Sequence, residues 1–74
     1  MANSIEITML LDLYGEVLTN KQRDYLNFYY NDDLSLSEIA ENEGITRQGV
    51  RDAIKRAEAL LFDMESKLKF SKKL

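Results

Sequence analysis

The stretch LSEIAENEGITRQGVRDAIKR, residues 36–56, decides the fold of this chain of 74 residues. It has the spacing of a short amphipathic helix, a glycine turn and a second helix. Two helices joined by a tight turn can cross steeply only if a small residue lies at their contact and the corner residue tolerates a positive φ. Ala40 and Gly44 occupy these two places. The stretch therefore predicts a helix-turn-helix.

Both helices of this unit carry start signals. Ser35 and Glu38 have the spacing of a capping box, and Thr46 is the natural N-cap of the second helix. Glu43 stands directly before the glycine, where an apolar residue is usual, so we expect the end of the first helix to be loosely packed. Side chains three or four residues apart share a helix face, so four apolar residues are expected to meet under the turn. They are Ile39, Ile45, Val50 and Ile54.

The outward face of the second helix is polar and mostly basic. With Arg47 as its first residue and 100° per residue, Gln48, Arg51 and Lys55 fall opposite the apolar residues. A glutamine amide can pair with adenine at two points, an arginine with guanine or phosphate, and a lysine mainly with phosphate. Asp52 can accept from cytosine N4 or orient an arginine. The predicted DNA-binding residues are Arg47, Gln48, Arg51, Asp52, Lys55 and Arg56, the alternative being a face that is only solvated.

Length and composition exclude several classes of protein. A chain of 74 residues has the size of one small domain, so we expect residues 1–74 to form a single helix-turn-helix domain. The absence of cysteine and histidine excludes disulfides, the usual zinc sites and histidine-based catalysis. We therefore expect no enzyme, no cofactor and no metal site. No apolar stretch approaches the roughly 20 residues that span a bilayer, and no signal peptide is recognisable, which predicts a soluble, cytoplasmic protein.

Charge is distributed unevenly within a net charge of −3. Residues 1–43 hold nine acidic and two basic side chains, whereas residues 44–74 hold four acidic and eight basic ones. The basic half can orient on a phosphate backbone while the acidic half lowers affinity, so weak, salt-sensitive binding is expected. The C-terminal lysines have an alternative role, because cations complement the dipole at a helix end. They are Lys67, Lys69, Lys72 and Lys73.

The rest of the chain predicts an all-α, small helical bundle with a long C-terminal helix. It contains no proline and only three glycines, which favours helices joined by short turns. We expect a first helix over about residues 4–18. A second capping pair, Thr19 and Gln22, opens a helix that runs through about Tyr30, followed by a turn at residues 31–33.

The N-terminal helix is more apolar than one helix face requires, and the apolar stripe of the last helix continues to the end of the chain. Counted from Arg47, the last helix runs for about 24 residues, or about 36 Å at 1.5 Å per residue, which exceeds the width expected of so small a domain. We favour a homo-oligomer formed through the N-terminal helix and the end of the C-terminal helix, which suits a palindromic DNA site. Packing within a monomer is the alternative. The apolar faces are Ile5, Met9, Leu10, Leu13, Tyr14, Val17 and Leu18 in the first helix, and Ala57, Leu60, Leu61, Met64, Leu68 and Phe70 in the last.

The segment from Leu18 to Leu61 closely resembles the YlxM-type family of small bacterial helix-turn-helix proteins, which look like the fourth region of sigma factors. The matching pieces are TNKQ from Thr19, the run YYNDD at residues 29–33, and the strings SLSEIA, GITRQGV and IKRAE. Arg51 and Gly49 replace an aromatic residue and an alanine that the family often has there. Family genes neighbour those of the signal recognition particle. The resemblance thus implies a DNA-binding regulatory protein, with double-stranded DNA and components of that particle as partners.

Two other functions remain open on the sequence. An adaptor of the signal recognition particle that binds protein or RNA, and not DNA, would use the acidic N-terminal half against a basic partner. A homodimerising scaffold without nucleic acid is the other. Stacking of single-stranded bases on Tyr25, Tyr29 or Tyr30 is disfavoured, because the positive neighbours that such sites need are absent around residues 32 and 33.

Overall fold

Helices make up nearly all of the structure, a computed structural model that describes residues 3–69. The four α-helices are α1 (Ser4–Tyr14), α2 (Asn20–Leu26), α3 (Leu36–Glu43) and α4 (Arg47–Leu68). A 3₁₀ turn, η1 (Gly15–Val17), follows α1, and a π-helical turn, η2 (Asn27–Asn31), prolongs α2. Residues 3–69 contain no strand. The predicted all-α class with a long last helix is confirmed.

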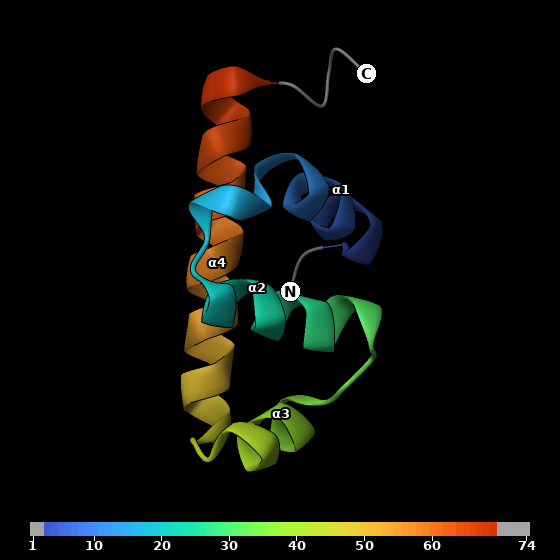
Figure 1. Cartoon of the computed structure of the whole chain (residues 1–74), viewed down its shortest axis with the longest axis vertical. Helices are drawn as coiled ribbons and strands as arrows, with labels where there is room; N and C mark the ends of the chain where they lie inside the picture. Colours follow the sequence, from blue (N-terminus) through green and yellow to red (C-terminus); the bar gives the residue numbers. More distant parts are fainter. Residues whose placement is uncertain (1–2, 70–74) are drawn as a thin grey trace.

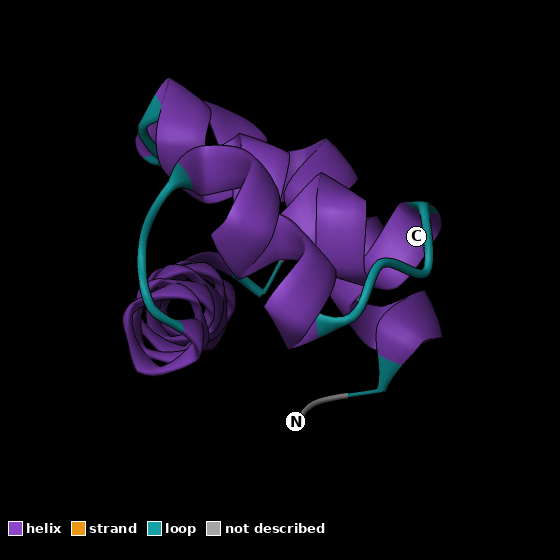
Figure 2. Ribbon diagram, turned by 90° about the horizontal axis from the view of Figure 1, so that it is seen from below, coloured by secondary structure: helices purple, strands orange, loops and turns teal. Residues whose placement is uncertain are grey.

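Helix α4 is the axis of the fold. α1, α2 and α3 pack along one side of it in chain order, and α3 lies beside the N-terminal end of α4 (Figure 1). Seen along its length, α4 stands next to the other helices and is not surrounded by them (Figure 2). The molecule measures 39 × 18 × 18 Å. Because α4, with its 22 residues, is about 33 Å long, it accounts for most of the 39 Å long axis.

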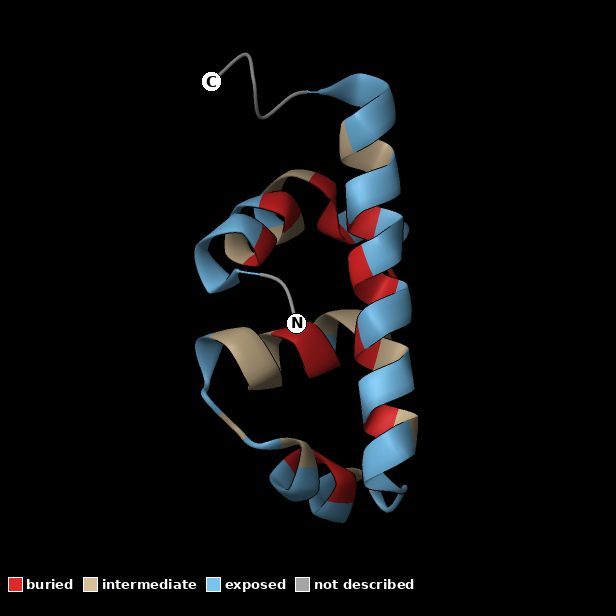
Figure 3. Cartoon of the chain, turned by 180° about the vertical axis from the view of Figure 1, so that it is seen from behind, coloured by how far each residue is buried: buried red, intermediate tan, exposed pale blue. Residues whose placement is uncertain are grey.

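The hydrophobic core lies between α4 and the row of shorter helices, so the opposite side of α4 is exposed along its length (Figure 3). Buried residues recur along α4 every three or four positions, as the period of an amphipathic helix requires. From α4 the buried apolar residues are Val50, Ile54, Ala57 and Leu61. From the other segments they are Ile7, Leu10, Tyr14, Leu18, Tyr25, Leu26, Ile39 and Ala40.

The apolar face predicted for the first helix is partly correct, because Leu10, Tyr14 and Leu18 are buried. Ile7, which the prediction omitted, is fully buried, whereas Ile5 is 80% and Val17 47% exposed. The sequence IEITMLLDLY is apolar on most sides of a helix, so its pattern does not select a face. The helix also ends at Tyr14, earlier than the predicted Leu18, and the chain continues as η1.

The predicted helix starts are correct in α2 and α3. The Thr19 hydroxyl accepts from the backbone N–H of Gln22, and the Gln22 side chain accepts from the N–H of Thr19. Ser35 and Glu38 form the same reciprocal pair, and the hydrogen bond from the Ser35 backbone holds the pKa of the Glu38 carboxyl below its usual value. Each capping box satisfies N–H groups that a helix end otherwise leaves without partners.

Two tyrosine hydroxyls connect the first half of the chain to α4, which the sequence did not predict. Tyr30 donates a hydrogen bond to Glu58, a carboxylate that is only 8% exposed, and Tyr14 donates to Glu65 at 2.6 Å. A buried carboxylate without a partner would be strongly unfavourable, so the hydroxyl of Tyr30 makes Glu58 tolerable there. Both contacts attach α4 to segments more than 25 residues away in sequence.

The end of α4 leaves apolar side chains in solvent. Leu61 is buried, but Leu60 and Leu68 are each 41% exposed, so the predicted apolar stripe is only partly covered. Phe62, which was not part of that stripe, is 36% exposed. The helix ends at Leu68 after 22 residues, against about 24 predicted. The predictions for Phe70, Lys72 and Lys73 lie outside the described residues.

Candidate nucleic-acid interface

The corner between α3 and α4 has the predicted geometry. Gly44 ends α3 with φ 70°, in the left-handed region that a glycine adopts without strain. Ala40 is buried, and its carbonyl accepts from the N–H of Ile45 at 3.1 Å. The Thr46 hydroxyl caps α4 by accepting from the N–H of Gly49 at 3.0 Å. These residues form the helix-turn-helix expected from their spacing.

One of the four residues predicted under the turn lies elsewhere. Ile39, Val50 and Ile54 are fully buried, but Ile45 is 42% exposed, so its predicted place in the core is wrong. Ile45 follows the left-handed corner, where the chain no longer has the helical period on which the prediction relied. Its side chain lies against the start of α4 at Gly49.

Gly49, which is unfavourable for a helix, faces the turn. A Cβ at this position would lie 3.2 Å from the Thr46 hydroxyl oxygen and 3.6 Å from Cδ1 of Ile45. The first distance is shorter than an ordinary van der Waals contact. The missing side chain therefore leaves room for the capping hydroxyl, which offsets part of the roughly 1 kcal/mol that glycine costs relative to alanine in a helix.

Glu43 holds the end of α3 in place, contrary to the expected loose packing. Its carboxylate accepts from Nζ of Lys21 at 2.7 Å, and the Glu43 side chain is 17% exposed against 69% for Lys21. This hydrogen bond and the charge of Glu43 raise the pKa of Lys21. Burial, with the charge of Glu43 adding to it, raises the pKa of Tyr25. The charged residue before the glycine thus links α3 to α2.

All six predicted DNA-binding residues lie exposed in the first three turns of α4. Arg47, Gln48 and Arg51, together with Leu36 of α3, line a shallow hollow where the two helices meet. The Gln48 side-chain nitrogen Nε2 donates to Oδ1 of Asp52 at 2.9 Å. The partner that the structure gives Asp52 is thus a glutamine and not the arginine considered from sequence. The remaining two, Lys55 and Arg56, follow on the same exposed side of the helix.

The unequal charge of the two halves appears on this surface. Four of the six side chains are basic and one is acidic. Helix α3 instead exposes two acidic side chains, Glu38 in its first turn and Glu41 nearer the corner. A polyanion is therefore attracted by α4 and repelled by the exposed side of α3, which favours an approach centred on α4.

Residues 3–69 contain neither a candidate metal site nor a membrane-spanning helix. No group of three or more His, Cys, Asp or Glu side chains is placed to hold a metal ion in this range. Within the same residues, no helix combines the length and the apolar character needed to cross a bilayer.

The family of the chain follows from comparison with known proteins. The model of the UPF0122 family, described as "Putative helix-turn-helix protein, YlxM / p13 like", matches residues 1–74. This chain belongs to the UPF0122 family. The predicted YlxM-type membership is confirmed, and the family description agrees with the α3–α4 corner. The description of UPF0122 names a helix-turn-helix and does not name an enzymatic reaction.

Curated UPF0122 proteins from several bacteria are about half identical to the chain. A relative from Clostridium kluyveri is 54% identical over 68 residues, which cover 92% of this chain and 61% of the relative. One from Fusobacterium nucleatum is 52% identical over 66 residues, covering 89% and 64%. One from Clostridium perfringens is 50% identical over 74 residues, covering 100% and 66%. The chain thus spans slightly less than two thirds of these UPF0122 relatives.

Proposed function

We propose that this chain is a regulatory protein that binds duplex DNA by placing the first three turns of α4 in the major groove. The observation that carries the proposal is the exposed, mostly basic face that begins directly after the helix-turn-helix corner. The major groove admits an α-helix, and in such units the second helix presents its N-terminal residues to the base edges.

The residues of this face form two groups, one that contacts base edges and one that contacts phosphates. Gln48 and Arg51 have the side chains that pair with base edges at two points, with adenine and guanine respectively. Arg47, Lys55 and Arg56 contact phosphates, which position the helix without reading sequence. The acidic surface of α3 and of the N-terminal half reduces the attraction, so binding is weak and strongly dependent on salt.

The proposal is tested by a salt titration of binding to random duplex DNA, single-stranded DNA and the RNA of the signal recognition particle. We expect binding to the duplex, with an affinity that falls steeply as salt rises. Gln48→Ala is expected to relax base preference, because it removes a base contact. Lys55→Ala is expected to weaken binding nearly equally on all duplexes and to reduce the salt slope by about one.

Other outcomes of this titration separate the proposal from its alternative. Binding to the duplex that does not depend on salt, or no binding at low salt, contradicts it. Selective binding of the particle's RNA supports the adaptor function instead, for which the exposed Asp32 and Asp33 offer an acidic surface to basic protein subunits. A role in the signal recognition particle pathway rests on the resemblance to the YlxM-type family.

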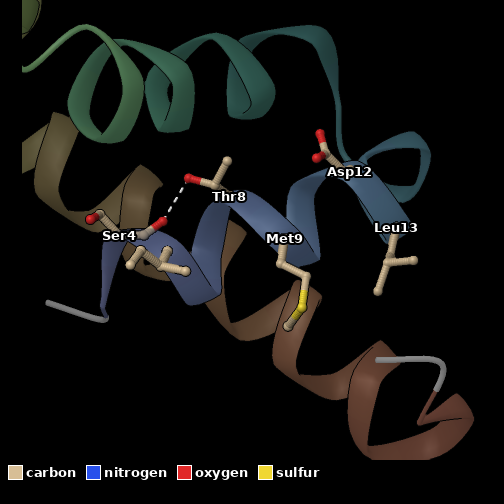
Figure 4. Close-up of a pocket in the computed structure, with 6 residues that line it drawn as sticks. Ser4, Thr8, Met9, Asp12 and Leu13 are labelled. Atoms are coloured by element: carbon tan, nitrogen blue, oxygen red, sulfur yellow. Dashed lines mark hydrogen bonds between the residues drawn. The ribbon is translucent and has the colours of Figure 1, made fainter. Parts of the chain in front are cut away.

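A second part of the proposal is that two copies pair through α1 and the end of α4. A shallow groove runs along α1, lined mainly by Ile5, Met9 and Leu13 with polar residues at its border. Met9 and Leu13 project from the same side of α1 in Figure 4, near the last turns of α4. The apolar groove of α1, together with the exposed Leu68 at the end of α4, fits a two-fold interface, in which the same patch of each copy meets the other.

Pairing is tested by the mass of the protein in solution. Wild type is expected to scatter light as a dimer, and the double variant Ile5→Ser, Met9→Ser as a monomer, because it loses the apolar contact. The two side chains are 80% and 38% exposed, so replacing them leaves the core unchanged. The control is Glu6→Ser with Glu16→Ser, which changes exposed residues outside the groove. A monomeric wild type, or a dimer that survives the apolar changes, contradicts this interface.

A further inference from the structure

We infer that Asp52 orients the amide of Gln48 and thereby makes Gln48 prefer adenine over guanine. The inference rests on the proposed binding of duplex DNA by α4. It assigns to Asp52 a positioning role, in which the carboxylate acts on base selection through its neighbour without contacting the base.

The geometry that supports this role is a single contact on the exposed side of α4. Nε2 of Gln48 donates to Oδ1 of Asp52 at 2.9 Å, between residues four apart in the helix. Asp52 is the only acidic residue between positions 47 and 57. The two ion pairs found within residues 3–69 join Lys21 to Glu43 and Lys67 to Asp63, so neither engages this carboxylate.

The identity of the atom facing Asp52 follows from its charge. An ionised carboxylate only accepts hydrogen bonds, so the Gln48 atom at 2.9 Å is the nitrogen and not the oxygen. One of the two N–H groups of the amide is then occupied. The carbonyl oxygen and one N–H of Gln48 remain for a base.

These two remaining groups match adenine. In the major groove adenine presents a donor at N6 and an acceptor at N7, whereas guanine presents acceptors at both O6 and N7. A glutamine can donate a separate hydrogen bond to each guanine acceptor only if both of its N–H groups are available, and Asp52 occupies one of them. The negative charge of Asp52 additionally disfavours the acceptor-rich edge of guanine. Asp52 therefore selects against guanine at the base read by Gln48.

The same charge has a second effect on binding. Asp52 lies among four basic side chains on a face that would meet phosphates, so it lowers the attraction to every duplex equally. Asp52 thus lowers the affinity of the protein for all duplexes and increases its preference for adenine over guanine at one position. An asparagine at this position removes the charge and keeps an acceptor oxygen, but its NH₂ group can also donate to Gln48, so it orients the Gln48 amide less firmly than the carboxylate does.

The test is a selection of bound sequences from random duplex DNA by wild type, Asp52→Ala, Asp52→Asn and Gln48→Ala. The position at which Gln48→Ala loses preference identifies the base read by Gln48. There we expect wild type to favour adenine over guanine about tenfold and Asp52→Ala less than about threefold. Asp52→Asn is expected to show a preference between those of wild type and Asp52→Ala, and both Asp52 variants are expected to bind all duplexes more tightly than wild type.

Each contrary result has a distinct meaning. An adenine-to-guanine ratio in Asp52→Ala equal to that of wild type overturns the inference, as does a wild-type preference for guanine at this position, while the proposed DNA binding stands. Absence of duplex binding by wild type at low salt overturns the proposed function and the inference with it. Asp52 and Gln48 are both exposed, and circular dichroism establishes that each variant is folded.

Discussion

Replacing Ile54 by alanine is expected to remove about half of the stability of this protein. Ile54 is fully buried in α4, against which the other three helices pack. Truncating a buried isoleucine to alanine costs about 2–5 kcal/mol, through lost burial and the cavity that remains. The whole chain is expected to be stable by about 4–11 kcal/mol, at roughly 0.05–0.15 kcal/mol per residue. The midpoint of thermal unfolding, followed by circular dichroism, is therefore expected to fall by more than about 10 °C.

Leu60→Ala provides the control for this change. Leu60 lies in the same helix but is 41% exposed, and alanine is the better helix former. Its unfolding midpoint is expected to stay within a few degrees of wild type, because surface substitutions usually change stability by about 0.5 kcal/mol or less. Equal losses in the two variants would show that the core does not lie on the Ile54 side of α4.

Reversing two charges on the recognition face, the exposed side of α4 from Arg47 to Arg56, is expected to abolish measurable DNA binding. Arg51 and Lys55 are exposed and contribute two of the four cations of this face. The double variant Arg51→Glu, Lys55→Glu removes two attractive contacts and places two carboxylates against the phosphates. We expect the affinity for duplex DNA to fall by about a hundredfold or more at moderate salt. Fluorescence anisotropy with a labelled duplex measures the loss.

The control for charge reversal changes the net charge by the same amount at the other end of α4. Lys67→Glu with Lys69→Glu alters two exposed lysines beyond the helix-turn-helix. The affinity of this variant is expected to fall less than about threefold, since exposed charges separated by more than the Debye length, about 10 Å at 0.1 M salt, are largely screened. If both double variants lose affinity equally, the overall charge governs binding and the recognition face does not.

The parts of the fold that the sequence predicted correctly are those set by neighbouring residues. Gly44, Ala40 and Thr46 have their observed places because a tight turn, a close helix contact and a helix start each require a particular residue type at a fixed spacing. The capping boxes of α2 and α3 are equally local. Spacing alone was sufficient for these features.

The predictions that failed concern features set by contacts between segments far apart in the sequence. The apolar residues of α1 surround the helix, so only contact with α4 and η2 selects Ile7 for the core over Ile5. The bond from Tyr30 to Glu58 joins residues 28 positions apart, and no local pattern distinguishes this glutamate from a solvated one. Its only sequence signal was a carboxylate four residues after Ile54, on the apolar side of α4.

For the candidate site, helix periodicity predicted the position of each residue but not its partner. The exposure of Gln48 and Arg51 follows from 100° per residue. The pairing of Gln48 with Asp52 also has helical spacing, but the sequence left the acceptor role of Asp52 open between a base and an arginine. Their roles on DNA stay predictions.

The order of the helices along α4 also determines which of them can detach while the rest of the fold stays intact. α3 lies at one end of this row, and its main contacts are with α4 and η2, whereas α4 contacts every other helix. Local opening needs less free energy than global unfolding and is confined to segments whose release leaves the rest intact. Detachment of α3 fits this description, and amide hydrogens in α3 should therefore exchange with solvent sooner than those in the middle of α4. A ligand seated on both helices of the corner would slow that exchange first in α3.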